Sequence, residues 1–154
     1  MNAVDRDAAL EPKECLRLLR TVSLGRVVFT ESALPAVRPV TFVAPDGEVI
    51  IPAGGASWGP KLDGTVVAFE VEDIDQATRE GWSVVVVGRA RLVTDPASLQ
   101  GFPPAGERPW APAAERLLLT IDIEHLSGRR MALVRPLGTG GRLAPVVVAE
   151  TDIG

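Results

Sequence analysis

Two adjacent runs near the middle of the chain, residues 66–75 and 81–90, constrain its fold more than any other feature. The first alternates apolar and acidic side chains, and the second begins Gly81-Trp82-Ser83 and continues into a run of valines, Val84 to Val87. Both runs are typical of β-strands, and the short polar link between them predicts antiparallel pairing. Because the valine run is apolar on both faces, one face is expected in the core and the other under a second subunit.

Other strand-like runs flank this pair, and a helix is expected before them, from about residue 11 to 21. Pro12 suits a first helical turn, and the apolar residues after it share one helical face. Pro45-Asp46-Gly47 is a strong turn signal between two of the runs. A short helix is expected over residues 96–100, and an irregular segment over 101–114. The expected additional strands are 26–30, 36–43, 48–51, 117–123 and a short last strand at 131–134. A mainly β fold follows, an antiparallel barrel of six to seven strands with the N-terminal helix and one or two short helices, since closure hides sheet edges.

Composition narrows the class of protein. The chain has 154 residues, which is the size of one domain. We expect a flexible N-terminus at 1–9, a barrel domain at 10–136 and a C-terminal tail at 137–154. The net charge of −4 argues against a nucleic-acid partner, which requires a basic face. A single cysteine, the lack of a signal-peptide core and the lack of a membrane-length apolar run predict a cytoplasmic protein that does not bind membranes.

The central pair of strands resembles a known family. Val66-Val67-Ala68-Phe69-Glu70-Val71 followed by Gly81-Trp82-Ser83-Val84 is similar to paired strands of the flavin-binding pyridoxamine 5′-phosphate oxidase-like proteins, and the resemblance covers roughly residues 10–130. It implies a split β-barrel and a homodimer with two flavin sites at the subunit interface. It also implies an oxidoreductase that uses FMN, or a deazaflavin instead, to act on a small-molecule substrate.

The same resemblance points to cofactor-binding residues. The run 38–42 matches a family strand that borders the flavin ring, so the ring is expected against residues 40–42 and Trp82. Ser57, Ser83 and Lys61 are expected at the ribityl phosphate. Packing in the core is the alternative for Val40 and Phe42, and packing at an interface for Trp82. His125, the only histidine, and Cys15 make no plausible metal site, and no catalytic residue is assigned. The candidate cofactor-binding residues are Val40, Thr41, Phe42, Ser57, Lys61, Trp82 and Ser83.

The expected phosphate grip departs from the family pattern. The family has an Arg-Thr pair followed by Ser-Lys, and an ungapped count places Pro52 and Ala53 on the pair and Ser57 and Trp58 on the second motif. Lys61 serves only if the loop shifts by three residues. Without the arginine fork, the phosphate would be held more weakly, mainly by main-chain amides and Ser57. A second hypothesis is therefore a non-catalytic split-barrel binding module that has lost the flavin phosphate grip and uses no cofactor.

Overall fold

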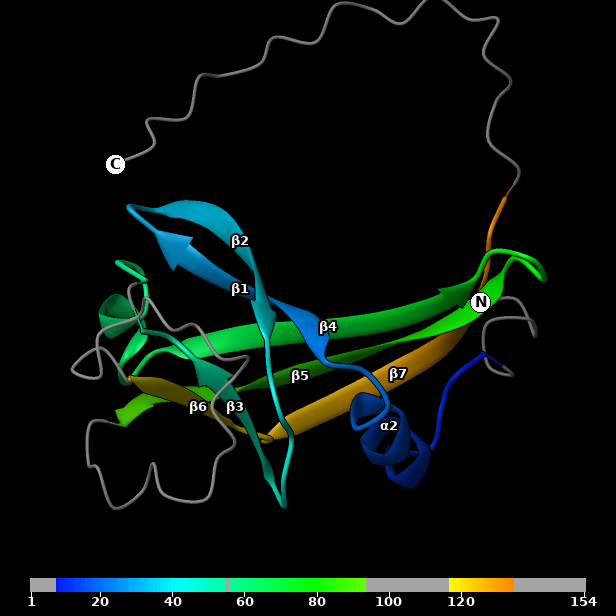
Figure 1. The fold of residues 1–154 in the computed structure, drawn as a ribbon, viewed down its shortest axis with the longest axis horizontal. Helices are drawn as coiled ribbons and strands as arrows, with labels where there is room; N and C mark the ends of the chain where they lie inside the picture. Colours follow the sequence, from blue (N-terminus) through cyan, green and yellow to red (C-terminus); the bar gives the residue numbers. More distant parts are fainter. Residues whose placement is uncertain (1–7, 55, 94–116, 135–154) are drawn as a thin grey trace, which may run out of the picture.

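The described part of the chain is one curled antiparallel sheet with a single α-helix at its side (Figure 1). The computed structural model describes residues 8–54, 56–93 and 117–134. Its helical elements are α2 (Pro12–Leu19) and a short 3-10 turn, η1 (Pro60–Leu62). Its strands are β1 (Leu24–Glu31), β2 (Leu34–Thr41), β3 (Glu48–Pro52), β4 (Val66–Asp75), β5 (Glu80–Val93), β6 (Leu118–Asp122) and β7 (His125–Ala132). The mainly β fold expected from the sequence is confirmed.

The strand order makes this sheet a barrel. The strands run β2-β1-β4-β5-β6-β3, and every pairing is antiparallel. An isolated bridge then joins the two ends of this order, because the Val43 amide donates to the Ile50 carbonyl at 3.0 Å and the Ile50 amide donates back at 2.8 Å. The two bridged residues flank the predicted turn at Pro45-Asp46-Gly47. Gly47 in this turn has a positive φ of 76°.

The barrel is split along β5, the longest strand. Its first part pairs with β7, up to Val87 opposite His125, and its last part pairs with β6, from Ala90 opposite Ile121. Gly88 lies at the changeover, where a Cβ atom would be 1.6 Å from the backbone oxygen of Asp122. Only glycine leaves room for the chain to cross from β6 to β7 at this point.

The core follows from the alternation along β4 and β5. Phe69, Val71, Val84 and Val86 are fully buried, and the ring of Phe69 meets that of Phe42 edge to face at 4.8 Å. These side chains and their neighbours form one cluster inside the barrel. The expectation that one face of the valine run lies in the core is confirmed for Val84 and Val86.

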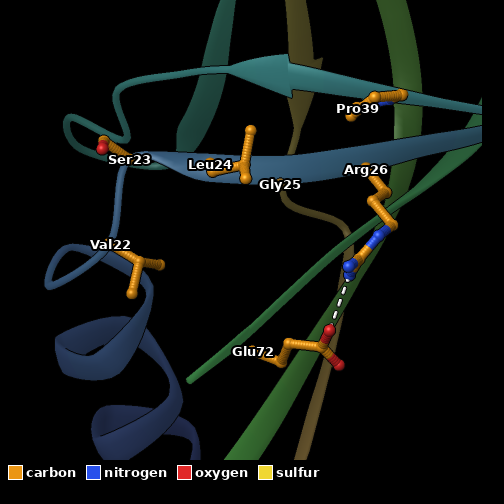
Figure 2. Close-up of a pocket in the computed structure, with 7 residues that line it drawn as sticks. All are labelled: Val22, Ser23, Leu24, Gly25, Arg26, Pro39 and Glu72. Carbon is orange, nitrogen blue, oxygen red and sulfur yellow. Dashed lines mark hydrogen bonds and ion pairs between the residues drawn. The ribbon is translucent and has the colours of Figure 1, made fainter. Parts of the chain in front are cut away.

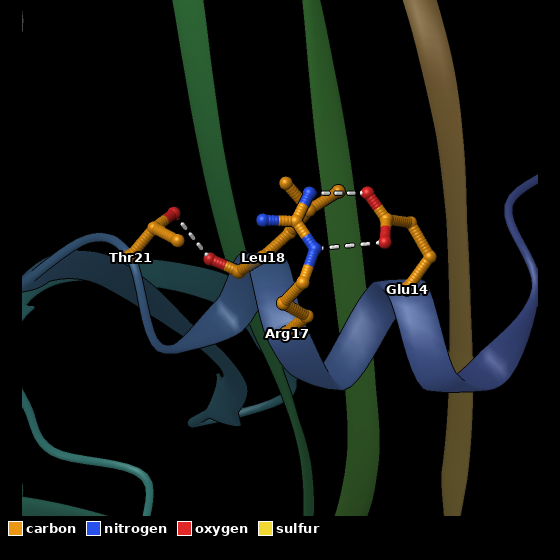
Figure 3. Close-up of polar contacts among 4 residues, drawn as sticks. All are labelled: Glu14, Arg17, Leu18 and Thr21. Carbon is orange, nitrogen blue, oxygen red and sulfur yellow. Dashed lines mark hydrogen bonds and ion pairs between the residues drawn. The ribbon is translucent and has the colours of Figure 1, made fainter.

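Helix α2 lies against β7 and β5 and buries its apolar side there (Figure 1). It ends at Leu19 rather than at the expected Thr21. The hydroxyl and the amide of Thr21 both donate to the Leu18 carbonyl, at 2.7 and 2.9 Å, which closes the last turn (Figure 3). On its exposed side Arg17 donates to Glu14, and this hydrogen bond lowers the pKa of the Glu14 carboxyl.

The last strand was predicted wrongly. The apolar run 131–134 was expected to form it, but β7 begins at His125 and ends at Ala132. Its polar residues pair along β5, and the segment before α2 borders its other edge, where the Leu10 amide donates to the Gly128 carbonyl at 2.9 Å. Tertiary pairing therefore overrides weak strand propensity. The expectations for 96–100, 101–114 and 137–154 lie outside the described residues.

Candidate functional site

Of the three candidate residues on and after β2, Thr41 alone has an exposed side chain. Val40 is half-buried against the core, and Thr41 is exposed at the end of β2, opposite Leu24. Phe42 is only 5% exposed and packs on Phe69, so its side chain belongs to the core. Val40 and Thr41 are successive residues and point to opposite faces of the sheet, so Thr41 and the main chain are the groups exposed on the outer face at this end of β2.

The segment after β3 carries the candidate phosphate residues. Ser57 and Lys61 are exposed, and Lys61 lies on η1. Trp58 is turned against Phe29, with ring centres 5.7 Å apart and planes 23° apart. Gly55 lies outside the described residues. Trp58 therefore packs on the barrel wall at the position where the family pattern has a lysine.

The positions of the missing Arg-Thr pair offer no replacement donor. Pro52, the last residue of β3, is exposed and has no amide hydrogen. Ala53 is buried, and its amide donates to the Leu117 carbonyl at 2.8 Å. No side-chain donor for an anion is present at these two positions.

Two cations nevertheless converge close by, on the carboxylate of Glu31 at the end of β1. The Lys61 ammonium donates to one of its oxygens at 3.3 Å, and the Arg38 guanidinium lies 3.7 Å from the other. Arg38 precedes Val40 by two residues on β2 and therefore shares its face. The sequence predicted Lys61 as a cofactor-binding residue, but it made no such prediction for Arg38 or Glu31. The cluster shows that Lys61 and Arg38 can hold one anionic group together, as a phosphate would require.

Trp82 and Ser83 lie elsewhere on the sheet. Both belong to β5, which β1 and β4 separate from β2. Trp82 points to the core side and is half-buried there, whereas Ser83 points to the outer side, opposite Glu72 and Arg129. Within one chain these residues do not meet Lys61.

A cleft of about 440 Å³ opens between β1 and β4, where their ladder stops after Arg26 and Glu70 (Figure 2). Arg26 reaches across and donates to Glu70 at 2.9 Å and to Glu72 at 2.8 Å. Burial raises the pKa of the Glu70 carboxyl, although the bond from Arg26 opposes the shift. The lining residues are Val22, Ser23, Leu24, Gly25, Arg26, Pro39 and Glu72.

This cleft lies between two of the candidate residues. Leu24 on one wall pairs with Thr41, and Glu72 on the other wall pairs with Ser83. Its volume falls within the range of small-ligand sites. The sequence did not predict it, because it forms where two strands that are distant in the chain diverge.

Among residues 8–54, 56–93 and 117–134, no group of histidine, cysteine, aspartate and glutamate side chains is arranged to hold a metal ion. In the same part of the chain, no helix has the length and apolarity to cross a membrane.

Known proteins share this fold and sequence. The family model described as pyridoxamine 5′-phosphate oxidase matches residues 11–130. The uncharacterized protein Rv0080 of Mycobacterium tuberculosis is 39% identical over 131 residues, which cover 79% of this chain and 84% of that protein. A solved FAD binding protein from Mycobacterium smegmatis is 27% identical with a TM-score of 0.62, over 80% of this chain and 96% of the other. An FAD-binding protein from Mesorhizobium loti, at 24% identity and a TM-score of 0.64 over 80% of this chain and 97% of the other, shares the fold.

The family match covers most of the described structure, from the start of α2 into β7. It includes both strands on which the sequence resemblance rests and the closed strand order around them. The chain therefore belongs to the pyridoxamine 5′-phosphate oxidase family.

Proposed function

We propose that the protein is a flavin-dependent oxidoreductase that binds FMN and acts on a small-molecule substrate. The observation that carries this proposal is its family membership, together with 27% identity to an FAD binding protein over most of both chains. A bound flavin supplies hydride transfer to or from the substrate, and the protein supplies binding and shape. The cationic pair of Lys61 and Arg38 supports this proposal, because it suits a phosphate group.

We further propose that the site is shared between two copies of the chain in a homodimer. Thr41 pairs with Leu24 at the start of β1, and Lys61 contacts Glu31 at the end of the same strand. β1 has 8 residues, so its ends lie about 23 Å apart at ~3.3 Å per residue. The five-carbon ribityl chain between the ring and the phosphate of FMN is shorter than this. If the ring contacts Thr41 as expected, then Ser57 and Lys61 at the phosphate come from the partner.

The outer face of the sheet supports the homodimer. Val37, Val28, Ala68 and Val87 lie side by side in successive strands, and together we call them the outer row. Val37 is 49% exposed, and the other three are half-buried. An apolar row that crosses four strands at the surface is suited to burial against a second copy.

Absorbance and fluorescence test the cofactor. Purified protein is expected to be yellow, or to quench the fluorescence of added FMN at micromolar concentration. Ser57→Asp is expected to abolish FMN binding by repulsion, whereas Lys61→Ala is expected to weaken it only modestly. A colourless protein that leaves flavin fluorescence unchanged contradicts the FMN proposal. If both variants bind FMN as the wild type does, the phosphate lies elsewhere.

A deazaflavin cofactor and a non-catalytic binding module remain the competing proposals. The loss of donors at Pro52 and Ala53, and the packing of Trp58 on Phe29, favour the module. Titration with oxidised and reduced deazaflavin, followed by tryptophan quenching, separates these two proposals. Tight binding that depends on the redox state supports a deazaflavin enzyme, and binding of neither form leaves the module.

A further inference from the structure

We propose that Glu31 is a specificity residue that disfavours a terminal phosphate at the Lys61–Arg38 pair. Its carboxylate stands where such a phosphate would contact both cations. The site therefore discriminates among flavins by the charge at the end of the ribityl chain. This inference rests on the proposed flavin-binding function.

The position of Glu31 is well fixed. It is the last residue of β1 and pairs with Leu34 across a tight turn, in which Ser32 and Ala33 have φ of 49° and 63°. Its side chain is 32% exposed, against 65% for Lys61 and 45% for Arg38. The carboxylate is the most enclosed of the three charged groups, so an arriving anion competes with it for its two partners.

Charge counting gives the direction of the effect. With Glu31 the cluster has one net positive charge, and without it the cluster has two. A terminal phosphate carries about −1.5 to −2 near neutral pH, so it is repelled by Glu31 in addition to competing with it. The diphosphate of FAD carries one negative charge per phosphorus, and riboflavin carries none. Removal of the carboxylate is expected to help FMN most, FAD less and riboflavin hardly at all.

The size of the effect is limited by solvent. The three side chains are partly exposed, and exposed ion pairs are weakened by water and salt. Glu31 therefore reduces phosphate affinity without preventing binding. We expect a change of about tenfold in FMN affinity on its removal, as for charges a few ångströms apart near a protein surface.

The test is Glu31→Gln, which keeps the shape of the side chain and removes its charge. Wild type and variant are titrated with riboflavin, FMN and FAD, and flavin fluorescence gives each Kd. In the variant the Kd for FMN is expected to fall about tenfold and that for riboflavin to stay within about twofold, with FAD between them. High salt is expected to reduce the gain.

Asp122→Asn is the matched control. Asp122 pairs with Arg91 at 3.0 Å, and its side chain is 35% exposed, close to the value for Glu31. This variant loses the same charge from β6, and its FMN-to-riboflavin affinity ratio is expected to equal that of the wild type. Melting curves verify that both variants fold. Adding Lys61→Ala to Glu31→Gln is expected to remove most of the gain in FMN affinity.

The outcomes separate this inference from the proposed function. If neither the wild type nor the Glu31→Gln variant binds any of the three flavins, the proposed function is overturned and this inference with it. If flavins bind but Glu31→Gln leaves the FMN-to-riboflavin ratio unchanged, only the role of Glu31 is overturned. An equal change in the Asp122→Asn variant also overturns it, because the effect is then one of overall charge.

Discussion

Gly88 shows how a single missing side chain permits the split of the barrel. β5 exchanges β7 for β6 around it, and the chain from Asp122 to His125 passes directly over its Cα. The adjacent backbone is also held in place, because the Glu124 amide donates a hydrogen bond to the Val87 carbonyl at 3.2 Å. A side chain at position 88 forces backbone, rather than a flexible side chain, to move.

Gly88→Ala is therefore expected to destabilise the fold by more than about 3 kcal/mol, a loss typical of severe core changes. Gly64→Ala is the control. Gly64 has a φ of 77° with open space around its Cα, so that change is expected to cost only the left-handed strain, about 1 kcal/mol. Urea denaturation measures both. Equal losses in the two variants contradict the steric account.

The turn between β1 and β2 contains a correctable strain. Ala33 has a φ of 63°, a left-handed conformation that suits a two-residue hairpin turn but not an alanine side chain. Ala33→Gly is expected to stabilise the protein by about 0.5 kcal/mol, since relief of the strain exceeds the added chain entropy.

Thermal unfolding checks this prediction. Ala36→Gly in the extended part of β2 is the control, and it is expected to destabilise. A loss of stability in both variants shows that the turn is not strained.

At this scale the sequence predicted Ser57 and Lys61 as cofactor-binding residues, but it did not predict that Lys61 and Arg38 lie beside Glu31. Lys61 could be predicted because it lies three residues after Trp58, the position matched to the lysine of the family's Ser-Lys motif. Its contact with Glu31 joins residues thirty positions apart. Arg38 was part of a matched run, but its role depends on where β1 ends and η1 begins. Local patterns carry no information on such a contact.

Among the elements, those with a strong pattern of their own were predictable. The pair β4–β5 and the turn at 45–47 have clear alternation or turn residues. β7 has neither, since His125 to Arg130 includes polar residues and a glycine, and it forms because β5 offers a free edge. The closing bridge between Val43 and Ile50 likewise follows from the whole sheet rather than from any run.

Helix α2 protects the single cysteine of the chain. Cys15 is fully buried beside Gly128, and burial raises the pKa of its thiol. Few thiolates are therefore present at neutral pH, and reagents have no access. We expect iodoacetamide to label the folded protein very slowly and the urea-unfolded protein rapidly.

Mass spectrometry over time checks the labelling of Cys15. Leu19→Ala, which removes a fully buried contact of the same helix, is expected to speed it up by loosening α2. Rapid labelling of the wild type contradicts a firmly docked helix.

For the whole molecule, the two faces of β5 have different partners. Val84 and Val86 are fully buried in the barrel, whereas Val85 and Val87 are half-buried on the outer face, where Val87 belongs to the outer row. The sequence left open which pair would face a second subunit. In the structure Val84 and Val86 lie in the core. The proposed dimer contact therefore involves Val85 and Val87.

Val85→Asp with Val87→Asp is expected to convert a dimer into a folded monomer, because the charges disfavour burial against a partner. Val84→Asp with Val86→Asp is expected to unfold the chain instead. Sedimentation velocity and circular dichroism distinguish the two outcomes. A wild-type protein that sediments as a stable monomer overturns the homodimer.

The closure of the barrel through β3 has a consequence during synthesis. Ile50 pairs with Thr120, and Pro52 pairs with Leu118. A ribosome adds about 5–20 residues per second, so β3 emerges several seconds before the strand that covers its edge. Over that interval β1, β2, β4 and the start of β5 are able to assemble as neighbours, while β3 exposes Val49 and Ile51, both fully buried in the finished barrel. β3 thus keeps an unpaired edge and an uncovered apolar face in the nascent chain until β6 has been made.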